Sequence, residues 1–160
     1  MNTERNTEMD FSIFYTELET LMKKMEYETA RLKFDDPDIS EMLRTMMPVD
    51  AAGNRILLEV IAAEYNEHTF VIQIYTTLLM EIGPGLEALK ETLTNWNLTC
   101  PIGAFGIYTG ENQLYHKYNY LMPSDEDLKD MAAEIFYIIH LIMEVITDIY
   151  AEAAEISAGS

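Results

Sequence analysis

The beginning of the chain carries apolar residues every three or four positions, the spacing that places side chains on one face of a helix. These residues are Phe14, Leu18, Leu21, Met22 and Met25. Asp10 precedes them, where a helix N-cap is expected. The pattern predicts an amphipathic helix over residues 11–32, followed by a polar connection at 35–38. Residues 1–9 are polar, and we expect them to be disordered.

The next part of the chain shows the alternation and turn chemistry of strands. Residues 39–48 fit either a helix or a strand. The turn at 50–54 and the β-branched-rich run after it favour a hairpin that pairs 41–49 with 55–65. A third strand is predicted over 69–80, with one apolar face and one polar face, as in an antiparallel sheet that has one face in water.

The stretch Gly83-Pro84-Gly85 breaks the third strand and opens a short helix over 86–97. It has neither the length of a dinucleotide-binding glycine loop nor the lysine of a phosphate-binding loop, so it predicts a helix start only. Residues 103–108 and 113–121, separated by a Thr-Gly-Glu turn, predict a second hairpin.

The last helix is predicted to begin at Ser124, which forms an approximate capping box with Asp127. An apolar stripe then runs along it: Leu128, Met131, Ile135, Ile138, Ile139, Ile142, Ile146 and Ile149. Between Ile135 and Ile146 the helix is apolar on most sides, so it is either buried in one core or shared with a partner.

Together these elements predict an α+β fold in one domain over 1–160. The order is α-β-β-β-α-β-β-α, with one antiparallel sheet packed with helices. A chain of 160 residues is long enough for one sizeable core without disulfides.

Composition excludes several classes of partner. Ten basic and twenty-eight acidic residues give a net charge of −18, which disfavours binding to nucleic acid or to anionic lipid. The longest apolar-rich stretch is too short to span a bilayer, so we expect no membrane insertion. The N-terminal residues lack the apolar core of a signal peptide, and we expect a cytoplasmic protein.

The chain carries no pattern typical of catalysis or metal binding. His68, His116 and His140 lack the spacing of known metal sites, so they are more simply surface or core histidines. Cys100 has no basic residue nearby in the sequence and is expected to be a small core residue rather than a nucleophile. We therefore expect no metal, no cofactor and no enzymatic activity.

Methionine and tyrosine are the abundant contact-forming residues. Eleven methionines and ten tyrosines can supply an adaptable surface for protein partners, although individual methionines are more simply core residues. Tyr115, Tyr118 and Tyr120 are expected to give one face of the sheet a partner-binding character.

Two segments resemble a known family: LTNWNLTCPIGAFGI at 93–107 and QLYHKYNYLM at 113–122. They are similar to the YbjN-like proteins, regarded as bacterial sensory-transduction regulators, which share a fold with type III secretion chaperones. With the long strand before them and the last helix, the resemblance covers roughly residues 55–150. It implies the same order of elements, and the chaperones of this fold are acidic homodimers that hold an extended client segment. It carries over no binding residue.

The resulting hypothesis is a non-enzymatic protein-interaction module, either a chaperone-like binder or a regulator. The alternatives are a small-ligand sensor with a tyrosine-lined pocket and a structural or assembly protein without a client. A homodimer is expected, with Trp96 or the flank formed by Phe136 and Met143 at its interface.

Overall fold

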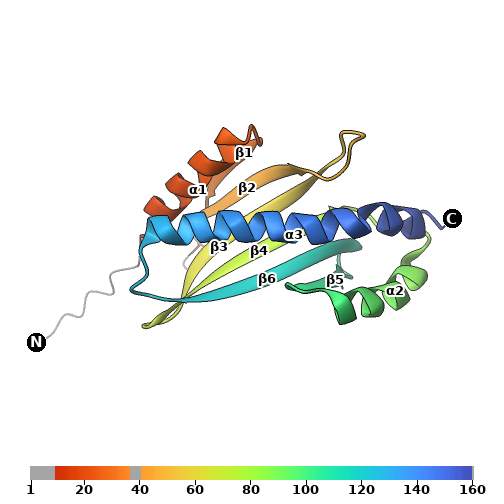
Figure 1. Cartoon of the computed structure of the whole chain (residues 1–160). Coiled ribbons are helices and arrows are strands. Elements are labelled where there is room, and N and C mark those ends of the chain that lie inside the picture. Colours follow the sequence, from red (N-terminus) through yellow and green to blue (C-terminus); the bar gives the residue numbers. More distant parts are fainter. Residues whose placement is uncertain (1–9, 37–40, 160) are drawn as a thin grey trace, which may run out of the picture.

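Three helices and one antiparallel sheet of six strands make up the part of the chain that the computed structural model describes, residues 10–36 and 41–159 (Figure 1). The elements are α1 (Ser12–Lys24), β1 (Thr29–Lys33), β2 (Glu41–Pro48), β3 (Arg55–Asn66), β4 (Thr69–Leu79), α2 (Leu86–Thr99), β5 (Ala104–Tyr108), β6 (Gln113–Pro123) and α3 (Leu128–Ser157). The strands lie in the order β1-β2-β3-β4-β6-β5, and every neighbouring pair is antiparallel. The α+β class is confirmed, and the predicted elements occur in the predicted order, with the strand β1 in addition.

One additional strand corrects the predicted first helix. The sequence predicts a helix that reaches residue 32, but α1 ends at Lys24, and Glu26 has a φ of 62°, which a helix does not allow. Residues 29–33 instead form the edge strand β1, paired with β2. The apolar repeat of the helix stops at Met25, and pairing with the sheet overrides the helical propensity of residues 29–33.

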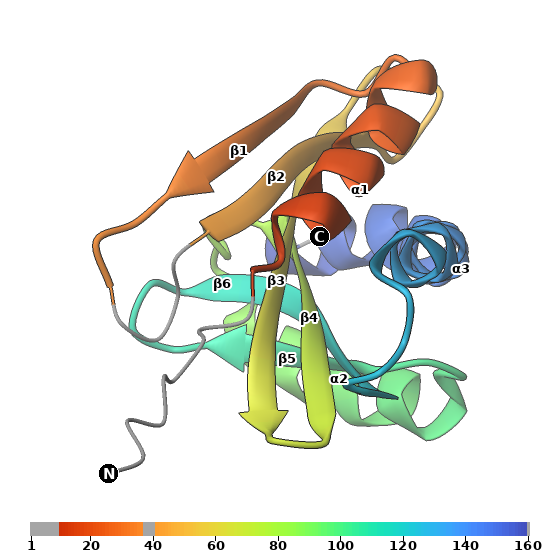
Figure 2. The same ribbon diagram turned by 90° about the vertical axis from the view of Figure 1, so that its left-hand side faces the viewer.

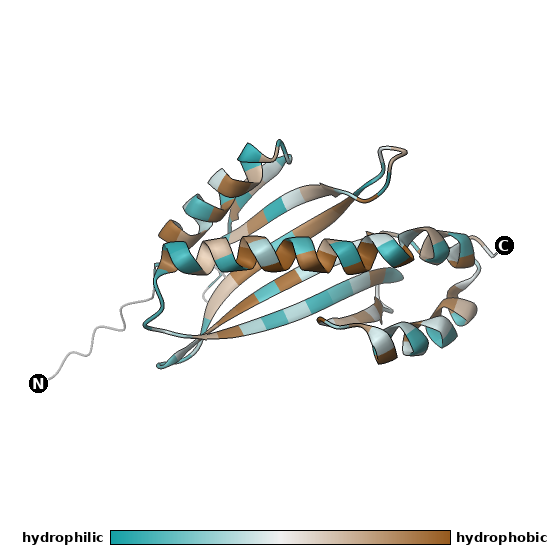
Figure 3. Cartoon of the chain, in the orientation of Figure 1, coloured by the Kyte–Doolittle hydropathy of each residue, from teal (hydrophilic) through white to brown (hydrophobic). Residues whose placement is uncertain are grey.

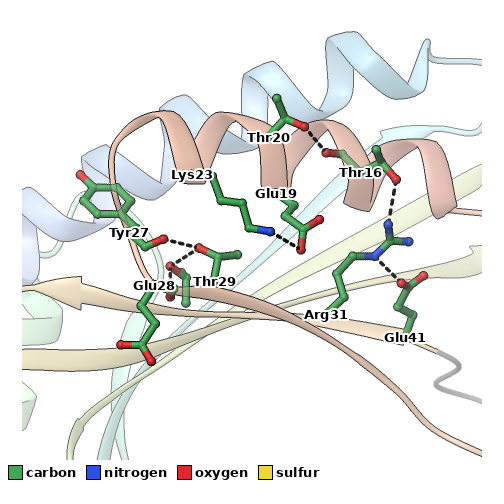
Figure 4. A network of polar contacts seen from close by, with 10 residues as sticks. Thr16, Glu19, Thr20, Lys23, Tyr27, Glu28, Thr29, Arg31 and Glu41 are labelled. Carbon is green, nitrogen blue, oxygen red and sulfur yellow. Dashed lines mark hydrogen bonds and ion pairs between the residues drawn. The ribbon is translucent and has the colours of Figure 1, made fainter.

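A polar network fastens β1 to α1 and β2 (Figure 4). The guanidinium of Arg31 donates to the Glu41 carboxylate at 2.5 Å and to the Thr16 hydroxyl at 2.8 Å. The Thr29 hydroxyl lies 3.0 Å from that of Thr45 on the neighbouring strand. A short edge strand is thus held by side chains as well as by its ladder.

The ambiguous segment 39–48 is resolved in favour of a strand, because residues 41–48 form β2. Some predictions fall on residues outside the part that the structure describes. These are Pro37 and Asp38 of the predicted connection, Ile39 and Ser40 of the ambiguous segment, and residues 1–9, which were expected to be disordered.

All three helices lie on the same side of the sheet (Figure 2). Ring contacts reach inward-facing strand positions: Phe11 just before α1 meets Phe70, and Trp96 on α2 meets Phe105. The longer strands bury a shared set of inward-facing residues under the helices: Leu43, Thr45, Met47, Ile56, Leu58, Val60, Phe70, Ile72, Ile74, Leu114 and His116. The core is the space between this face and the helices.

The apolar stripe of α3 packs into that core, with Met131, Ile135, Ile139, Ile142 and Ile146 fully buried, which is the first of the two alternatives that the sequence left open. Polar and apolar residues alternate around α3 (Figure 3). Its start differs from the prediction: Asp127, not Ser124, is the N-cap, and its carboxylate accepts hydrogen bonds from the N–H groups of Lys129 and Asp130. Ser124 donates instead to the carbonyl of Glu67, because the β3–β4 turn lies beside it.

The glycines between β4 and α2 pack against the end of α3. The N–H of Gly85 donates to the Ser157 carbonyl at 3.0 Å, and the N–H of Gly83 donates to the Ser157 hydroxyl at 2.9 Å. A Cβ atom at position 85 would lie 1.7 Å from the carbonyl oxygen of Ile156. The predicted helix start is confirmed, and glycine is required there because two backbones meet.

Within residues 10–36 and 41–159, no helix combines the length and the apolar character that crossing a membrane requires.

Candidate protein-binding surfaces

A hollow of about 380 Å³ lies between the C-terminal end of α2 and the second half of α3. We call it the α2–α3 groove. It is lined by Trp96, Thr99, Cys100, Pro101, Phe105, Glu144, Val145, Asp148 and Ile149. Of the residues predicted to meet a partner, Trp96 is the one that lines this groove.

Short-range contacts fix the floor of the α2–α3 groove. The amide group of Asn97 donates to the carbonyl of Phe105 at 2.9 Å and accepts from its N–H at 2.7 Å, which ties the end of α2 to β5. The Trp96 ring meets the Phe105 ring edge-on, with centroids 5.9 Å apart. The aromatic wall is therefore preformed in the chain on its own.

The connection from α2 to β5 depends on Gly103 and His116. Gly103 has a φ of 68°, and a Cβ atom there would lie 2.6 Å from the His116 ring. His116 Nε2 lies 2.8 Å from the Ile102 carbonyl oxygen and donates to it. Burial lowers the pKa of His116, so the ring stays neutral and holds the loop in place.

The two walls of the groove differ in chemistry. Val145 and Ile149 of α3 face the aromatic wall, while Glu144 and Asp148 add two carboxylates from the same helix. Cys100 is half-buried, and its thiol donates to the Ile102 carbonyl at 3.1 Å. The groove can thus accept an apolar side chain beside a cationic one.

The predicted Phe136–Met143 flank packs largely within one chain. Met143 is only 7% exposed, so it is not available to a partner. Phe136 is half-buried, and its ring packs edge-on against His140 with centroids 4.6 Å apart. His140 in turn donates from Nδ1 to the Phe136 carbonyl and accepts at Nε2 from the Tyr27 hydroxyl. This corrects the interface expected at Met143.

The apolar middle of α3 is also covered without a second chain. Helices α1 and α2 both pack against α3, so its stripe is buried between them and the sheet. This helix therefore gives no reason to expect a dimer, and any contact between two copies has to use another surface.

The three predicted tyrosines do not form one surface. Tyr118 and Tyr120 face the helices, whereas Tyr115 faces the opposite side and stacks on Tyr75 with ring centroids 5.0 Å apart. The Tyr120 hydroxyl donates to the Glu134 carboxylate, which raises the pKa of Tyr120 to about 12. Alternation along a strand separates neighbours of odd and even number, so the grouping of Tyr115 with the other two is wrong.

The side of the sheet away from the helices is a second candidate surface, which we call the open face. It consists of every second residue from Met42 to Met46, Arg55 to Ala63, Thr69 to Thr77, Ala104 to Tyr108 and Gln113 to Leu121, with Ala30 and Leu32. No described helix covers it (Figure 2). The alternation of the strands predicts a polar face here, and it does not single this face out as a binding surface.

Apolar side chains dominate the open face: Leu32, Met42, Met46, Leu57, Ile61, Val71, Tyr75, Tyr108, Tyr115 and Leu121. A hollow of about 250 Å³ opens among Met46, Leu57, Thr77 and Met80. Neither this hollow nor the α2–α3 groove is lined by a tyrosine.

The three histidines lie in separate places: His68 in an exposed turn, His116 in the core and His140 on α3. Among the described residues, no group of three or more histidine, cysteine, aspartate or glutamate side chains is arranged to hold a metal ion.

Comparison with models of known protein families gives no match, and a search among curated proteins gives none either. The resemblance to the YbjN-like proteins therefore stays an expectation from the sequence.

Proposed function

We propose that this protein is a non-enzymatic protein-interaction module that binds a segment of a partner protein in the α2–α3 groove. The observation that carries the proposal is the preformed groove with an aromatic wall, an aliphatic wall and two carboxylates. We take the setting to be a bacterium, as the resemblance implies, and expect the protein in its cytoplasm.

The groove chemistry defines the partner. Tryptophan is among the residues that contribute most to protein–protein binding, and Trp96 is half-buried with its ring at the groove. An aliphatic or aromatic side chain of the partner would fill the space between Trp96 and Val145. A lysine or arginine beside it would lie near Glu144 and Asp148, drawn by the net charge of −18.

The test uses the fact that Trp96 is the single tryptophan of the chain. Random twelve-residue peptides without tryptophan are displayed and selected on the immobilised protein, and the selected peptides are titrated against Trp96 fluorescence. We expect peptides that share an apolar residue flanked by lysine or arginine, and we expect them to shift the emission of Trp96.

Charge-reversal variants locate the binding site. Glu144→Lys and Asp148→Lys change exposed side chains at the groove, and together they should weaken the selected peptides by about tenfold or more. Glu152→Lys is the matched control, because it makes the same change on the same helix outside the groove. Equal affinity for the groove variant and the control would contradict the site, and the absence of any selected peptide would contradict the function.

Native partners are then sought with the same pair of variants. Partners captured from the host by the wild type and by Glu152→Lys, and lost with the groove variant, are expected if the groove serves the protein in the cell. The two alternatives, a ligand sensor with a tyrosine-lined pocket and a structural protein without a client, have no observation in their favour.

A further inference from the structure

We propose that the open face joins two copies of this chain, packed sheet against sheet around a two-fold axis. The proposal does not rest on the binding of a segment in the α2–α3 groove, because the groove lies on the helix side of the sheet.

The distribution of charge is the first observation. The chain has twenty-eight acidic residues, yet Glu59 is the one acid among the outward positions of the six strands. Arg44, Arg55 and Lys117 share this face with it. Two chains that each carry a net charge of −18 repel one another at most orientations. Glu28, just before β1, adds a second carboxylate, which is paired with Arg55 at 2.9 Å, so the open face is a surface on which two copies can meet with little acid against acid.

The arrangement of these charges is self-complementary. Arg44, Glu59, Tyr75 and Lys117 lie side by side across β2, β3, β4 and β6. Glu59 is paired with Arg44 at 2.8 Å, while no ion pair of Lys117 is found among the described residues. Each copy carries both positive and negative side chains in this row. In a two-fold arrangement Lys117 of one copy can therefore approach the Glu59 carboxylate of the other copy.

Apolar character and size agree with a stable contact. Apolar side chains lie on both sides of the polar row through Arg44, Glu59 and Lys117, and large exposed apolar patches mark interaction sites. With a rise of ~3.4 Å per residue and ~4.8 Å between strands, the four longer strands cover roughly 35 Å by 20 Å. That footprint is about 700 Å², close to the ~800 Å² per partner of a standard interface. Two twisted sheets can pack face to face with their strands about 30° apart.

The first test measures mass by light scattering between 1 and 100 µM. We expect the wild type to reach the mass of two chains. Ile61→Lys and Leu121→Lys, which put a charge on the open face, should give one chain. Leu98→Lys is the matched control: Leu98 is 79% exposed on α2, away from this face, and the variant should dimerise as the wild type does.

Leu121 is 57% exposed, so its replacement leaves the packing of the single chain intact. If the wild type has the mass of a single chain at 100 µM, the proposal is overturned. It is also overturned by a dimer that survives both sheet variants, or by one that Leu98→Lys also dissociates.

A second test needs no variant. Hydroxyl-radical labelling of the wild type is compared at 1 and 100 µM. We expect Tyr75 and Tyr115 to become at least threefold less reactive at the higher concentration, while Tyr137 on α3, which is 64% exposed, keeps its reactivity. Unchanged labelling of Tyr75 and Tyr115 in a dimer would place the interface elsewhere and overturn the proposal. Peptide binding at Trp96 is measured separately, so either proposal can fail alone.

Discussion

The hydroxyl of Tyr15 on α1 accepts a hydrogen bond of 2.7 Å from the backbone N–H of Ala62 on β3. The same hydroxyl donates to the carbonyl of Glu41 on β2 at 3.0 Å. The ladder between β2 and β3 has Leu43 opposite Val60 as its last pair on this side, and in the same register the next pair that faces the helices would be Glu41 and Ala62. A helix side chain thus takes the place between the two strands where their direct pairing stops. Burial raises the pKa of Tyr15 to about 12, so the hydroxyl keeps its proton.

We predict that Tyr15→Phe lowers the free energy of unfolding by about 1–3 kcal/mol, because it leaves the Ala62 N–H and the Glu41 carbonyl without their partner. Urea denaturation measures the change. Tyr137→Phe is the control, since Tyr137 is exposed and its hydroxyl lies outside the core. Equal stability of the two variants would mean that water satisfies both backbone groups.

A second prediction concerns the contact between α2 and the end of α3. Gly85→Ala forces a Cβ atom to within 1.7 Å of the Ile156 carbonyl, which only a shift of one backbone can relieve. We expect a loss of about 3 kcal/mol, at the upper end of the usual range for overpacking. Gly110→Ala, where the new Cβ meets the Tyr108 ring at 3.4 Å, should be tolerated. Comparable melting temperatures for the two variants would show that the β4–α2 connection moves freely.

Periodicity together with turn chemistry predicted five of the six strands and all three helices, since each buries one face and repeats its apolar residues accordingly; for β2 the turn at 50–54 was needed, because residues 39–48 fit both periods. The strand β1 has no such repeat, because an edge strand of five residues is held by its neighbour and by Arg31 rather than by its own apolar face. The sequence placed the start of α3 at Ser124 instead of Asp127 for a related reason: the Ser124 hydroxyl donates to the carbonyl of Glu67 in the β3–β4 turn, a contact distant in sequence.

The two candidate surfaces differ in how far they could be predicted from the sequence without the tertiary structure. Trp96 could be singled out as the single tryptophan, but its companions Val145 and Ile149 come from another helix about fifty residues away. The open face did leave a signal in the sequence. When every second residue is taken from the predicted strands, starting at 55, 69 and 113, the set contains a single acid, Glu59, although the chain has twenty-eight acidic residues. Counting acids by strand face would have revealed it.

The buried histidine gives a prediction on pH. His116 is fully buried, its Nε2 donates to Ile102, and its Nδ1 has no hydrogen-bond partner in the structure. Burial lowers its pKa in the folded chain, so the unfolded chain binds more protons as the pH falls below about 6.5. The stability that the neutral ring contributes is present above that pH and is lost as the pH falls toward the lowered pKa.

We therefore expect the wild type to lose more stability than His116→Gln between pH 7.5 and 5.5, with a difference of at most about 1.4 kcal/mol for each pH unit below 6.5. Urea denaturation at both pH values gives the two slopes. His68→Gln replaces an exposed histidine and should keep the slope of the wild type. Parallel slopes for the wild type and His116→Gln would show that His116 does not control the response to acid.

The last prediction concerns salt, where two opposite effects compete. The net charge of −18 makes the folded chain repel itself, and salt screens that repulsion. Salt also weakens exposed ion pairs such as Lys90–Glu87 and Arg55–Glu28, but each of these contributes only about 0–1 kcal/mol. Because repulsion among the excess acids outweighs a few exposed pairs, we expect the melting temperature at pH 7.5 to rise by several degrees between 0.02 and 0.3 M sodium chloride.

Dimerisation would raise the melting temperature in the same direction, because screening also lets two acidic chains approach. The experiment is therefore repeated on Leu121→Lys at 2 µM, where we expect a single chain and a rise that reports on the fold alone. Sucrose at matched osmolality is the uncharged control for solvent effects that do not depend on charge. A melting temperature that falls with salt in Leu121→Lys would mean that ion pairs, rather than the excess of acids, dominate the electrostatics of the folded chain.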